Sequence, residues 1–381
     1  MIYLDNNATT KVDREVIDAM LPYLGEYFGN PSSDHPYGIK ARQAVESSRA
    51  MVAGLINASD DEIIFTSGGT EANNMAIIGT SLLFSSRTVT RKSHGKGHII
   101  TSCVEHPSVL NPCRYLHDIG FDVTYLPVDR YGLISLHSLD NAIRGDTILI
   151  TIMHANNEIG SIEPIAEIGR IAKQKDIVFH SDAAQSIGKS HIDVQELGLD
   201  LMTIVSHKFY GPKGIGALYI RKGVEIKPIL FGAGHERGLR PGTENVPGIV
   251  GLGKACEIAK RDTGTRLSLF RTLSERLFNG LLKAIPDIRL NGHKTERLQN
   301  TLNITFPGIS SARLLSAIRD RVSVSAGSAC HSGIQKPSPV LKAIGLTDED
   351  ALSSVRFSLG KDNTEDEIGK AVEIISVAVR G

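Results

Sequence analysis

Asp182-Ala-Ala-Gln185 and Ser206-His-Lys-Phe-Tyr-Gly-Pro-Lys-Gly214 are the two stretches that decide the fold of this chain. Each follows a short apolar run: Ile177-Val-Phe179 leads into the first, and Leu201-Met-Thr-Ile-Val205 leads into the second. Runs of this length, bounded by turn residues, are typical of strands buried in a parallel sheet. Open α/β sheets bind their ligands outside the carboxyl ends of such strands. The sequence therefore predicts that Asp182 and Lys208 lie together at a ligand site.

This pair of residues has the chemistry of a pyridoxal phosphate (PLP) site. A lysine forms a Schiff base with the cofactor, and a carboxylate keeps the pyridinium nitrogen protonated so that the ring can accept electrons. Lys208 and Asp182 are the candidates for these roles. Taken singly, each also fits an ordinary surface lysine or buried acid, so the interpretation depends on the rest of the chain.

Composition excludes several function classes. The chain has 381 residues, with 42 Lys and Arg against 42 Asp and Glu. It therefore lacks the excess of basic residues that would indicate direct binding of nucleic acid. No apolar run approaches the roughly 18 residues of a membrane span, and the first residues lack the pattern of a signal peptide. The cysteines at 103, 113, 256 and 330 form neither a CxxC pair nor a zinc pattern. We therefore expect a cytoplasmic protein without membrane contact, structural metal or disulfide framework.

The arrangement of apolar runs predicts the α/β fold class. Seven strands are expected at 63–66, 98–102, 123–126, 147–153, 178–181, 202–206 and 217–220. Helices are expected between them, at 71–84, 107–119, 136–144, 164–174 and 193–197. Strands that alternate with helices predict a largely parallel sheet with both faces covered.

The order of elements changes after about residue 255, which predicts a second domain. A long helix at 249–284 leads into strands at 289–290, 301–306 and 356–358, with helices at 311–320, 338–344 and 364–380. We expect a large α/β domain over 13–255 and a smaller α+β domain over 256–381. Residues 1–12 are assigned to the smaller domain, because the extended residues 2–4 need a sheet with which to pair.

A phosphate-binding turn is indicated by Thr66-Ser-Gly-Gly-Thr-Glu-Ala-Asn-Asn74, which follows a strand and opens a helix. Two glycines let the backbone approach an anion, and the helix N-terminus offers free N–H groups and the positive end of its dipole. Gly69 and Thr70 are the candidate phosphate ligands. An ordinary glycine turn with a threonine cap is the alternative.

Two further strand ends carry polar side chains. His106 follows the strand at 98–102, and an imidazole there can stack on the pyridine ring and shuttle protons. Asn156 and Asn157 follow the strand at 147–153, where their amides suit a ring hydroxyl or a substrate carboxylate. The alternatives are a structural histidine and a turn in which asparagine side chains bond to backbone, the latter above all for Asn156.

Cys330 and Arg356 are the candidates in the last third of the chain. Small residues surround Cys330 in Gly327-Ser-Ala-Cys-His-Ser-Gly333, which indicates an exposed loop, and His331 can favour the thiolate. The other three cysteines have the apolar or helical surroundings typical of buried thiols. Arg356 lies on a short apolar strand, where burial is unfavourable unless the guanidinium binds an anion such as an α-carboxylate. A structural ion pair is the alternative for Arg356.

Together these motifs resemble those of the class V (fold type I) aminotransferases, and within them those of the cysteine desulfurases and their relatives the selenocysteine lyases. The match runs in order along nearly the whole chain, at 3–10, 29–33, 66–74, 104–106, 156–160, 182–185, 207–208, 211–214, 234–237, 240–243, 327–330 and 355–358. The resemblance implies a PLP-dependent enzyme of fold type I. Its large domain is expected to hold a mostly parallel seven-stranded sheet, and its small domain to carry the catalytic cysteine loop.

The resemblance also implies roles for the PLP-binding residues. Lys208 carries the Schiff base, Asp182 pairs with the pyridine nitrogen and Gln185 with the ring hydroxyl, and His106 stacks on the ring. The residues expected to bind phosphate are Gly69, Thr70, His207 and Thr243, the last supplied by the partner subunit of a homodimer.

The implied reaction converts L-cysteine to L-alanine. Asn157 and Arg356 hold the substrate carboxylate, and Cys330 accepts the sulfur as a persulfide. The sulfur then passes to an acceptor protein, such as an iron–sulfur scaffold. The alternative is a selenocysteine lyase, which releases selenide and L-alanine from L-selenocysteine. A non-catalytic sulfur-delivery protein is a third possibility, although it has no need of Lys208, Asp182 and Cys330 together.

The chain departs from the family pattern in three places. Val205 stands where many desulfurases carry a serine, so either Ser206 takes over that phosphate contact or the contact is missing. The segments around Cys330 and over 228–243 are more similar to selenocysteine lyases. Pro107, directly after Glu-His, is unlike the acidic residue that the lyases tend to have there.

Overall fold

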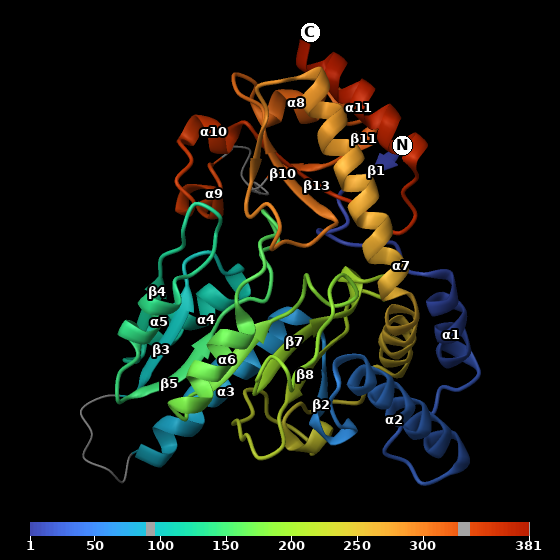
Figure 1. Cartoon of the computed structure of the whole chain (residues 1–381). Helices are drawn as coiled ribbons and strands as arrows, with labels where there is room; N and C mark the ends of the chain where they lie inside the picture. Colours follow the sequence, from blue (N-terminus) through green and yellow to red (C-terminus); the bar gives the residue numbers. More distant parts are fainter. Residues whose placement is uncertain (89–95, 327–335, 381) are drawn as a thin grey trace.

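The chain folds into two parts that lie one above the other in Figure 1. The computed structural model describes residues 1–88, 96–326 and 336–380. Both termini lie in the upper part, and the long helix α7 (Val246–Ala284) runs from the lower part into the upper one. Cys330 and His331 lie outside the described residues.

A seven-stranded sheet forms the centre of the lower part. Its strands are β2 (Ile63–Thr66), β3 (His98–Ser102), β4 (Asp122–Leu126), β5 (Thr147–Thr151), β6 (Val178–Asp182), β7 (Leu201–Val205) and β8 (Gly216–Ile220). They follow the order β2-β8-β7-β6-β5-β3-β4, in which β8 runs antiparallel to both neighbours and the other four pairs are parallel. The predicted α/β class and all seven predicted strands are confirmed.

Helices cover both faces of this sheet. They are α1 (Arg14–Gly25), α2 (Pro36–Ile56), α3 (Gly69–Thr88), α4 (Pro107–Asp118), α5 (Leu136–Ala142) and α6 (Ile165–Gln174), joined by the first half of α7. Helices α3 and α4 pack on the face that carries Ile99 and Leu149, whereas α2, α6 and α7 pack on the face that carries Ile100 and Ile150. Neighbouring residues of a strand point to opposite faces, so strands that are apolar throughout are buried on both sides.

The predicted helix at 193–197 is wrong, because residues 183–200 form a series of turns. Gly188 and Gly198 have φ angles of +71° and +65°, in the left-handed region that ends a helix. Between them, the Asp193 side chain accepts hydrogen bonds from the backbone N–H groups of Gln195 and Glu196. A short polar side chain that binds nearby backbone in this way favours a turn over a helix.

The upper part contains two small sheets. Strand β1 (Ile2–Tyr3) pairs in parallel with β11 (Val322–Ser323), which confirms that the N-terminal residues pair with a strand from the end of the chain. The second sheet is antiparallel, in the order β12 (Ser325–Ala326), β13 (Ser354–Ser358), β10 (Thr301–Thr305) and β9 (Arg289–Asn291). Its helices are α8 (Ser311–Ile318), α9 (Pro339–Ala343), α10 (Asp348–Leu352) and α11 (Glu365–Arg380).

Helix α7 belongs to the cores of both parts. Ile258 and Ala259 pack in the core of the lower part, whereas Leu273 and Leu277 pack in that of the upper part. The helix is 39 residues long and continuous across residue 255, so the domain boundary expected there stays a prediction. Neither α7 nor any other described helix has the length and apolar character needed to cross a membrane.

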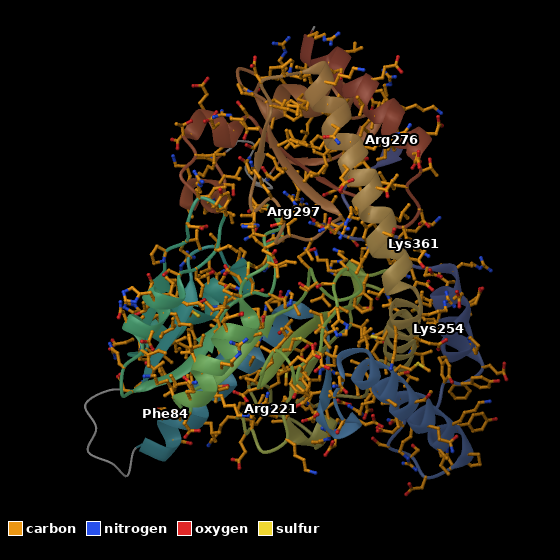
Figure 2. All side chains as sticks on the ribbon, viewed as in Figure 1. Phe84, Arg221, Lys254, Arg276, Arg297 and Lys361 are labelled. Carbon is orange, nitrogen blue, oxygen red and sulfur yellow. The ribbon has the colours of Figure 1, made fainter. Side chains whose placement is uncertain are left out.

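Ion pairs join elements along α7 that are far apart in the sequence. Figure 2 shows Lys361 beside the middle of α7 and Arg276 nearer its upper end. Lys361 pairs with Asp13, the N-cap of α1, and Arg276 pairs with Glu365 at the start of α11. The first pair thereby joins the N-terminal segment to the C-terminal segment, and the second joins α7 to α11.

A buried ion pair fixes α2 to the edge of the central sheet. The Arg49 guanidinium contacts the Glu236 carboxylate at 2.8 Å, and the two side chains are 7% and 3% exposed. Arg49 also donates to the carbonyl oxygen of Ile63, and Glu236 accepts from the N–H of Phe65, both on β2. Removing one charge of such a pair leaves the other buried without compensation.

We expect Glu236→Gln to lower the free energy of unfolding by about 3 kcal/mol, because it leaves the Arg49 charge buried without its partner. Glu46→Gln is the matched control. Glu46 pairs with the same arginine but is 59% exposed, so its loss should cost less than about 1 kcal/mol. Urea unfolding of both variants measures the difference, and equal losses would contradict this account.

Candidate active site

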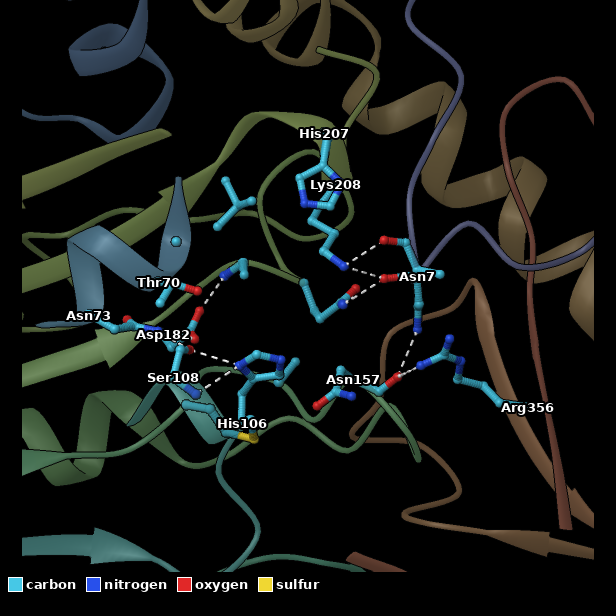
Figure 3. Close-up of a pocket in the computed structure, with 17 residues that line it drawn as sticks. Asn7, Thr70, Asn73, His106, Ser108, Asn157, Asp182, His207, Lys208 and Arg356 are labelled. Atoms are coloured by element: carbon cyan, nitrogen blue, oxygen red, sulfur yellow. Dashed lines mark hydrogen bonds between the residues drawn. The ribbon is translucent and has the colours of Figure 1, made fainter. Parts of the chain in front are cut away.

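A cavity of about 240 Å³ opens where the carboxyl ends of β6 and β7 face the upper part. Nine of the predicted site residues line it: Gly69, Thr70, His106, Asn157, Asp182, Gln185, His207, Lys208 and Arg356. The rest of the lining consists of Asn7, Ala8, Asn73, Ser108, Met153, Ala155, Ala184 and Val205. The fold therefore brings together residues that are spread over most of the chain (Figure 3).

Lys208 ends a short 3-10 turn (Ser206–Lys208) that directly follows β7. Its ammonium donates to the carbonyl oxygens of Asn7 and Ala8, at 2.7 and 2.8 Å. Burial, reinforced by the positive charge of Arg356, lowers the pKa of Lys208 to about 8, although Asp182 and Asp5 oppose the shift. A substantial fraction of the amine is therefore neutral, and so nucleophilic, at mildly alkaline pH.

Asp182, the last residue of β6, is held by two donors. Its carboxylate accepts from the side-chain amide of Asn73 at 2.8 Å and from the N–H of Ala184 at 2.9 Å. The same Asn73 nitrogen also donates to the Ser108 hydroxyl at 2.8 Å. The carboxylate is thus fixed while it remains part of the cavity wall.

His106 is the N-cap of α4 and faces the cavity. Its Nδ1 atom accepts from the N–H of Ser108 at 3.1 Å, so Nε2 carries the hydrogen when the ring is neutral. Burial, with a further contribution from the charge of Lys208, lowers the pKa of His106, and Asp182 opposes this. A neutral imidazole near the cavity can pass protons at ordinary pH.

The predicted phosphate turn is the N-terminus of α3, with Gly69 as its first residue. The first N–H groups of a helix have no partner within the helix, so they are available to an anion. A Cβ atom on Gly69 would lie 2.5 Å from a Val205 methyl group, so only glycine fits beside this valine. Val205 lies in the cavity wall next to this turn, and its side chain offers no hydrogen-bond donor to a phosphate.

Two of the residues predicted to bind phosphate, Ser206 and Thr243, do not line the cavity. Ser206 is fully buried, and its hydroxyl, which has no hydrogen-bond partner among the described residues, lies beneath Gly211 rather than beside Gly69. The expectation that Ser206 replaces the missing serine is therefore not supported by its position. Thr243 is exposed on the surface of this chain. His207 does line the cavity, and its Nδ1 contacts the Thr9 hydroxyl at 3.1 Å.

Arg356 and Asn157 form the wall of the cavity opposite Thr70 and Asp182, as Figure 3 shows. The Arg356 guanidinium pairs with Asp5 at 2.8 Å and donates to the backbone carbonyl of Asn157 at 3.0 Å. Its Nε atom is buried and has no partner among the described residues. Both interpretations of Arg356 thus have support, since it makes an ion pair and also presents a cation to the cavity.

Asn156 follows the structural alternative. Its side-chain oxygen accepts from the N–H groups of Glu158 and Ile159, and its nitrogen donates to the carbonyl of Val104. It shapes the turn that brings Asn157 to the cavity and does not line the cavity itself.

The sequence reasoning missed three residues that hold the site together: Asn7, Asn73 and Lys189. The backbone carbonyl of Asn7 accepts hydrogen bonds from Lys208 and Gln185. The side-chain amide of Asn73 donates to both Asp182 and Ser108. Asn7 and Asn73 lie inside the matching motifs at 3–10 and 66–74, but neither was assigned a role, because residue type alone gives no signal of these contacts.

The residues present fit a bound PLP. A lysine with a lowered pKa, a fixed carboxylate and a helix N-terminus surround one cavity, as the amine-reactive, pyridine-binding and phosphate-binding ends of PLP require. The Asn73 side-chain oxygen and the Arg356 Nε are buried and unpaired among the described residues, so polar capacity remains for a ligand. In the described part of the chain, no group of three or more His, Cys, Asp and Glu side chains could hold a metal ion.

We expect the Lys208 amine to react with a small aldehyde, trapped by cyanoborohydride, with a pH midpoint near 8, because burial and Arg356 lower its pKa. Arg356→Leu removes a positive charge and should raise the midpoint. Arg319→Leu, at a side chain that is 74% exposed, is the control and should leave it unchanged. Peptide mapping by mass spectrometry follows the labelling of Lys208, and an unchanged midpoint in Arg356→Leu would contradict the electrostatic explanation.

Comparisons with known proteins agree with this site. The sequence model of the aminotransferase class-V family matches residues 2–370. A protein named cysteine desulfurase IscS from Methanosarcina thermophila is 50% identical over 380 residues, covering 100% of this chain and 92% of that protein. A solved structure described as a NifS-like protein superimposes with a TM-score of 0.90 at 37% identity, covering 100% of this chain and 99% of the other.

A second solved structure, described as SspA in complex with cysteine, is 39% identical with a TM-score of 0.81. It covers 94% of this chain and 99% of its own. From the family match over nearly the whole length and the identity to full-length relatives, this chain belongs to the class-V aminotransferase family, whose cysteine desulfurase branch depends on pyridoxal phosphate.

Proposed function

We propose that this protein is a PLP-dependent cysteine desulfurase, which converts L-cysteine to L-alanine and transfers the sulfur through Cys330. The observation that carries the proposal is the cavity in which Lys208, Asp182 and the start of α3 meet. The chain's full-length relatives carry the name cysteine desulfurase, and SspA, a structural neighbour, was solved with cysteine bound. Those names favour the desulfurase over the selenocysteine lyase.

Bound PLP supplies an electron sink that weakens the bonds at the α-carbon of the amino acid. Lys208 would hold the cofactor through its amine and would move the α-proton of the substrate. Asp182 would keep the pyridinium nitrogen protonated, and its bonds to Asn73 and Ala184 fix the carboxylate for that task. His106 would lie against the cofactor and would supply protons from Nε2, since its Nδ1 is engaged by Ser108.

The substrate carboxylate is placed against Arg356 and Asn157 in this proposal. Arg356 keeps two donors on Asp5 and Asn157, and its side chain also lines the cavity, where its positive charge can attract an anion. A guanidinium that is already held by an acid on one side binds a second carboxylate in a defined orientation. Gly69, Thr70 and His207, which also line the cavity, would bind the cofactor phosphate.

Sulfur transfer is assigned to Cys330, on the evidence of the sequence. Its thiolate attacks the substrate sulfur, the new S–S bond leaves a persulfide on Cys330, and the breaking C–S bond leaves its electron pair on the carbon. Protonation of that carbon fragment yields L-alanine. The persulfide sulfur then passes to a sulfur-acceptor protein, such as an iron–sulfur scaffold. A reducing, cytoplasmic compartment keeps Cys330 in the thiol form that the reaction needs.

We expect the purified protein with PLP and a thiol reductant to release sulfide and L-alanine from L-cysteine in equal amounts. Lys208→Ala should abolish turnover, because it removes the amine that binds the cofactor and moves the proton. Cys330→Ala should abolish sulfide release from cysteine but keep the absorbance of the bound cofactor. Cys103→Ala, at a partly exposed cysteine, is the matched control and should keep full activity.

L-Selenocysteine is assayed in parallel, with selenide as the product. Selenide without sulfide would make the protein a selenocysteine lyase and reduce Cys330 to a residue of selectivity. Full cysteine activity in Cys330→Ala would rule out the persulfide route. Mass spectrometry of the peptide that contains Cys330, after reaction with cysteine and alkylation, detects the persulfide directly.

We also propose a homodimer in which Thr243 binds the phosphate in the partner subunit's cavity. Thr243 is exposed and outside the cavity of its own chain. Large apolar side chains are exposed on the same molecule: Leu21, Leu24, Phe28, Tyr37 and Phe231. Phe231, at 87% exposure, is twelve residues before Thr243 in the chain. Such side chains on a soluble protein favour an interface.

We expect mixing of two impaired variants to restore activity if Thr243 acts across the interface. Lys208→Ala is inactive, and Thr243→Val should bind PLP more weakly because a donor to the phosphate is lost. In a mixed dimer, one site combines an intact Lys208 with an intact Thr243 from the other subunit. Activity that stays at the level of the separate variants, in dimers verified by light scattering, would place Thr243 outside the partner's site.

A further inference from the structure

Lys189 is a buried lysine behind the cavity that the proposed reaction does not use. It lies in the turns after β6 and is 4% exposed. Its ammonium donates to the side-chain oxygen of Asn7 at 3.2 Å and to that of Gln185 at 3.0 Å. Both of these partners line the cavity, whereas Lys189 does not.

No carboxylate pairs with Lys189 among the described residues, which is unusual for a buried amine. The charged groups that act on it are Lys208 on the turn after β7 and Arg356 on β13, and both are positive. Burial, strengthened by these two charges, lowers the pKa of Lys189 well below its ordinary value. A buried amine held only by neutral oxygens gains little stability for the fold, so its hydrogen bonds point to a role at the site.

Lys189 contacts two amide side chains, of which that of Asn7 is also oriented by hydrogen bonds with Asn300 and Thr301. A lysine in this position donates, so the atoms that face it are the oxygens of Asn7 and Gln185. The Gln185 nitrogen is thereby turned to the opposite side, where it donates to the backbone carbonyl of Asn7 at 3.0 Å. That carbonyl also accepts from Lys208 at 2.7 Å. Gln185 therefore presents its nitrogen beside the reactive lysine.

We propose that Lys189 is a positioning residue that fixes Gln185 as a hydrogen-bond donor to the ring oxygen of the bound cofactor. The Gln185 nitrogen has two hydrogens, of which one goes to the Asn7 carbonyl and the other is left for the cavity that Gln185 lines. Without Lys189, only the bond to the Asn7 carbonyl holds this orientation, so the amide can rotate more readily and present its oxygen instead. The proposal rests on the proposed PLP function and adds a residue to it.

The loss of this hydrogen-bond donor should shift the pH midpoint of the cofactor's absorbance change in one direction. A donor to the anionic ring oxygen stabilises the form of the lysine-linked cofactor that has lost its proton, so the donor lowers the pH at which that proton leaves. If Lys189→Met lets Gln185 turn, the midpoint of the cofactor's absorbance change with pH should move upward by about half to one pH unit, the equivalent of one hydrogen bond. The affinity of the apoprotein for PLP should also fall.

A double-mutant cycle separates this role from a general loss of structure. Gln185→Leu removes the donor itself and should raise the midpoint by a similar amount. If Lys189 acts through Gln185, then Lys189→Met should add little to the shift in the Gln185→Leu background. Lys189→Leu is made alongside, so that the test does not depend on the folding of one variant. Lys222→Met, at a side chain 83% exposed and distant from the cavity, is the control.

The outcomes are distinguishable. Matching shifts in the single variants and no further shift in the double variant support the proposal. Additive shifts, or an unchanged midpoint in both Lys189 variants while Gln185→Leu moves it, would overturn the positioning role. If the unmodified protein forms no absorbing adduct with PLP and releases neither product, the proposed function is what fails.

Discussion

The backbone carbonyl of Asn7 is the point on which the site depends. It accepts hydrogen bonds from the amine of Lys208 and from the amide of Gln185, while the Asn7 side chain contacts Lys189 and Thr301. One N-terminal residue thus joins two strand ends of the lower part to β10 of the upper part. Because the partner of the reactive lysine comes from the other part of the molecule, the cavity exists only when both parts are in place.

Electrostatics in this closed space follow from the same arrangement. Lys208 and Arg356 are both cations, and burial together with their mutual repulsion lowers the pKa of Lys208 to about 8. Asp182 opposes that shift, and Asp5, which forms an ion pair with Arg356 at 2.8 Å, offsets part of the Arg356 charge. These four charges balance, so the attraction for a phosphate or a carboxylate comes from where Lys208 and Arg356 lie in the cavity wall and not from a net positive charge.

Much of the fold is readable from the sequence, because most strands of the central sheet are short and rich in apolar residues. Each of the seven expected strands is present, since a buried parallel strand must be apolar on both faces. The helix expected at 193–197 is absent because Gly188 and Gly198 adopt left-handed φ angles and Asp193 binds its own backbone. Those effects depend on local geometry, which residue type alone leaves open.

For the site, residue type and position along the chain predicted which side chains lie together in the cavity. Lys208, Asp182 and Gly69 were predicted from the chemistry that a strand end or a helix start offers. What only the tertiary structure decided is which of them face one another. Ser206 is one residue from a lining position yet points beneath Gly211, and Lys189 reaches the site although no motif marked it. Sequence patterns report burial and local conformation, whereas hydrogen bonds between segments far apart in the chain exist only once the two parts have packed together.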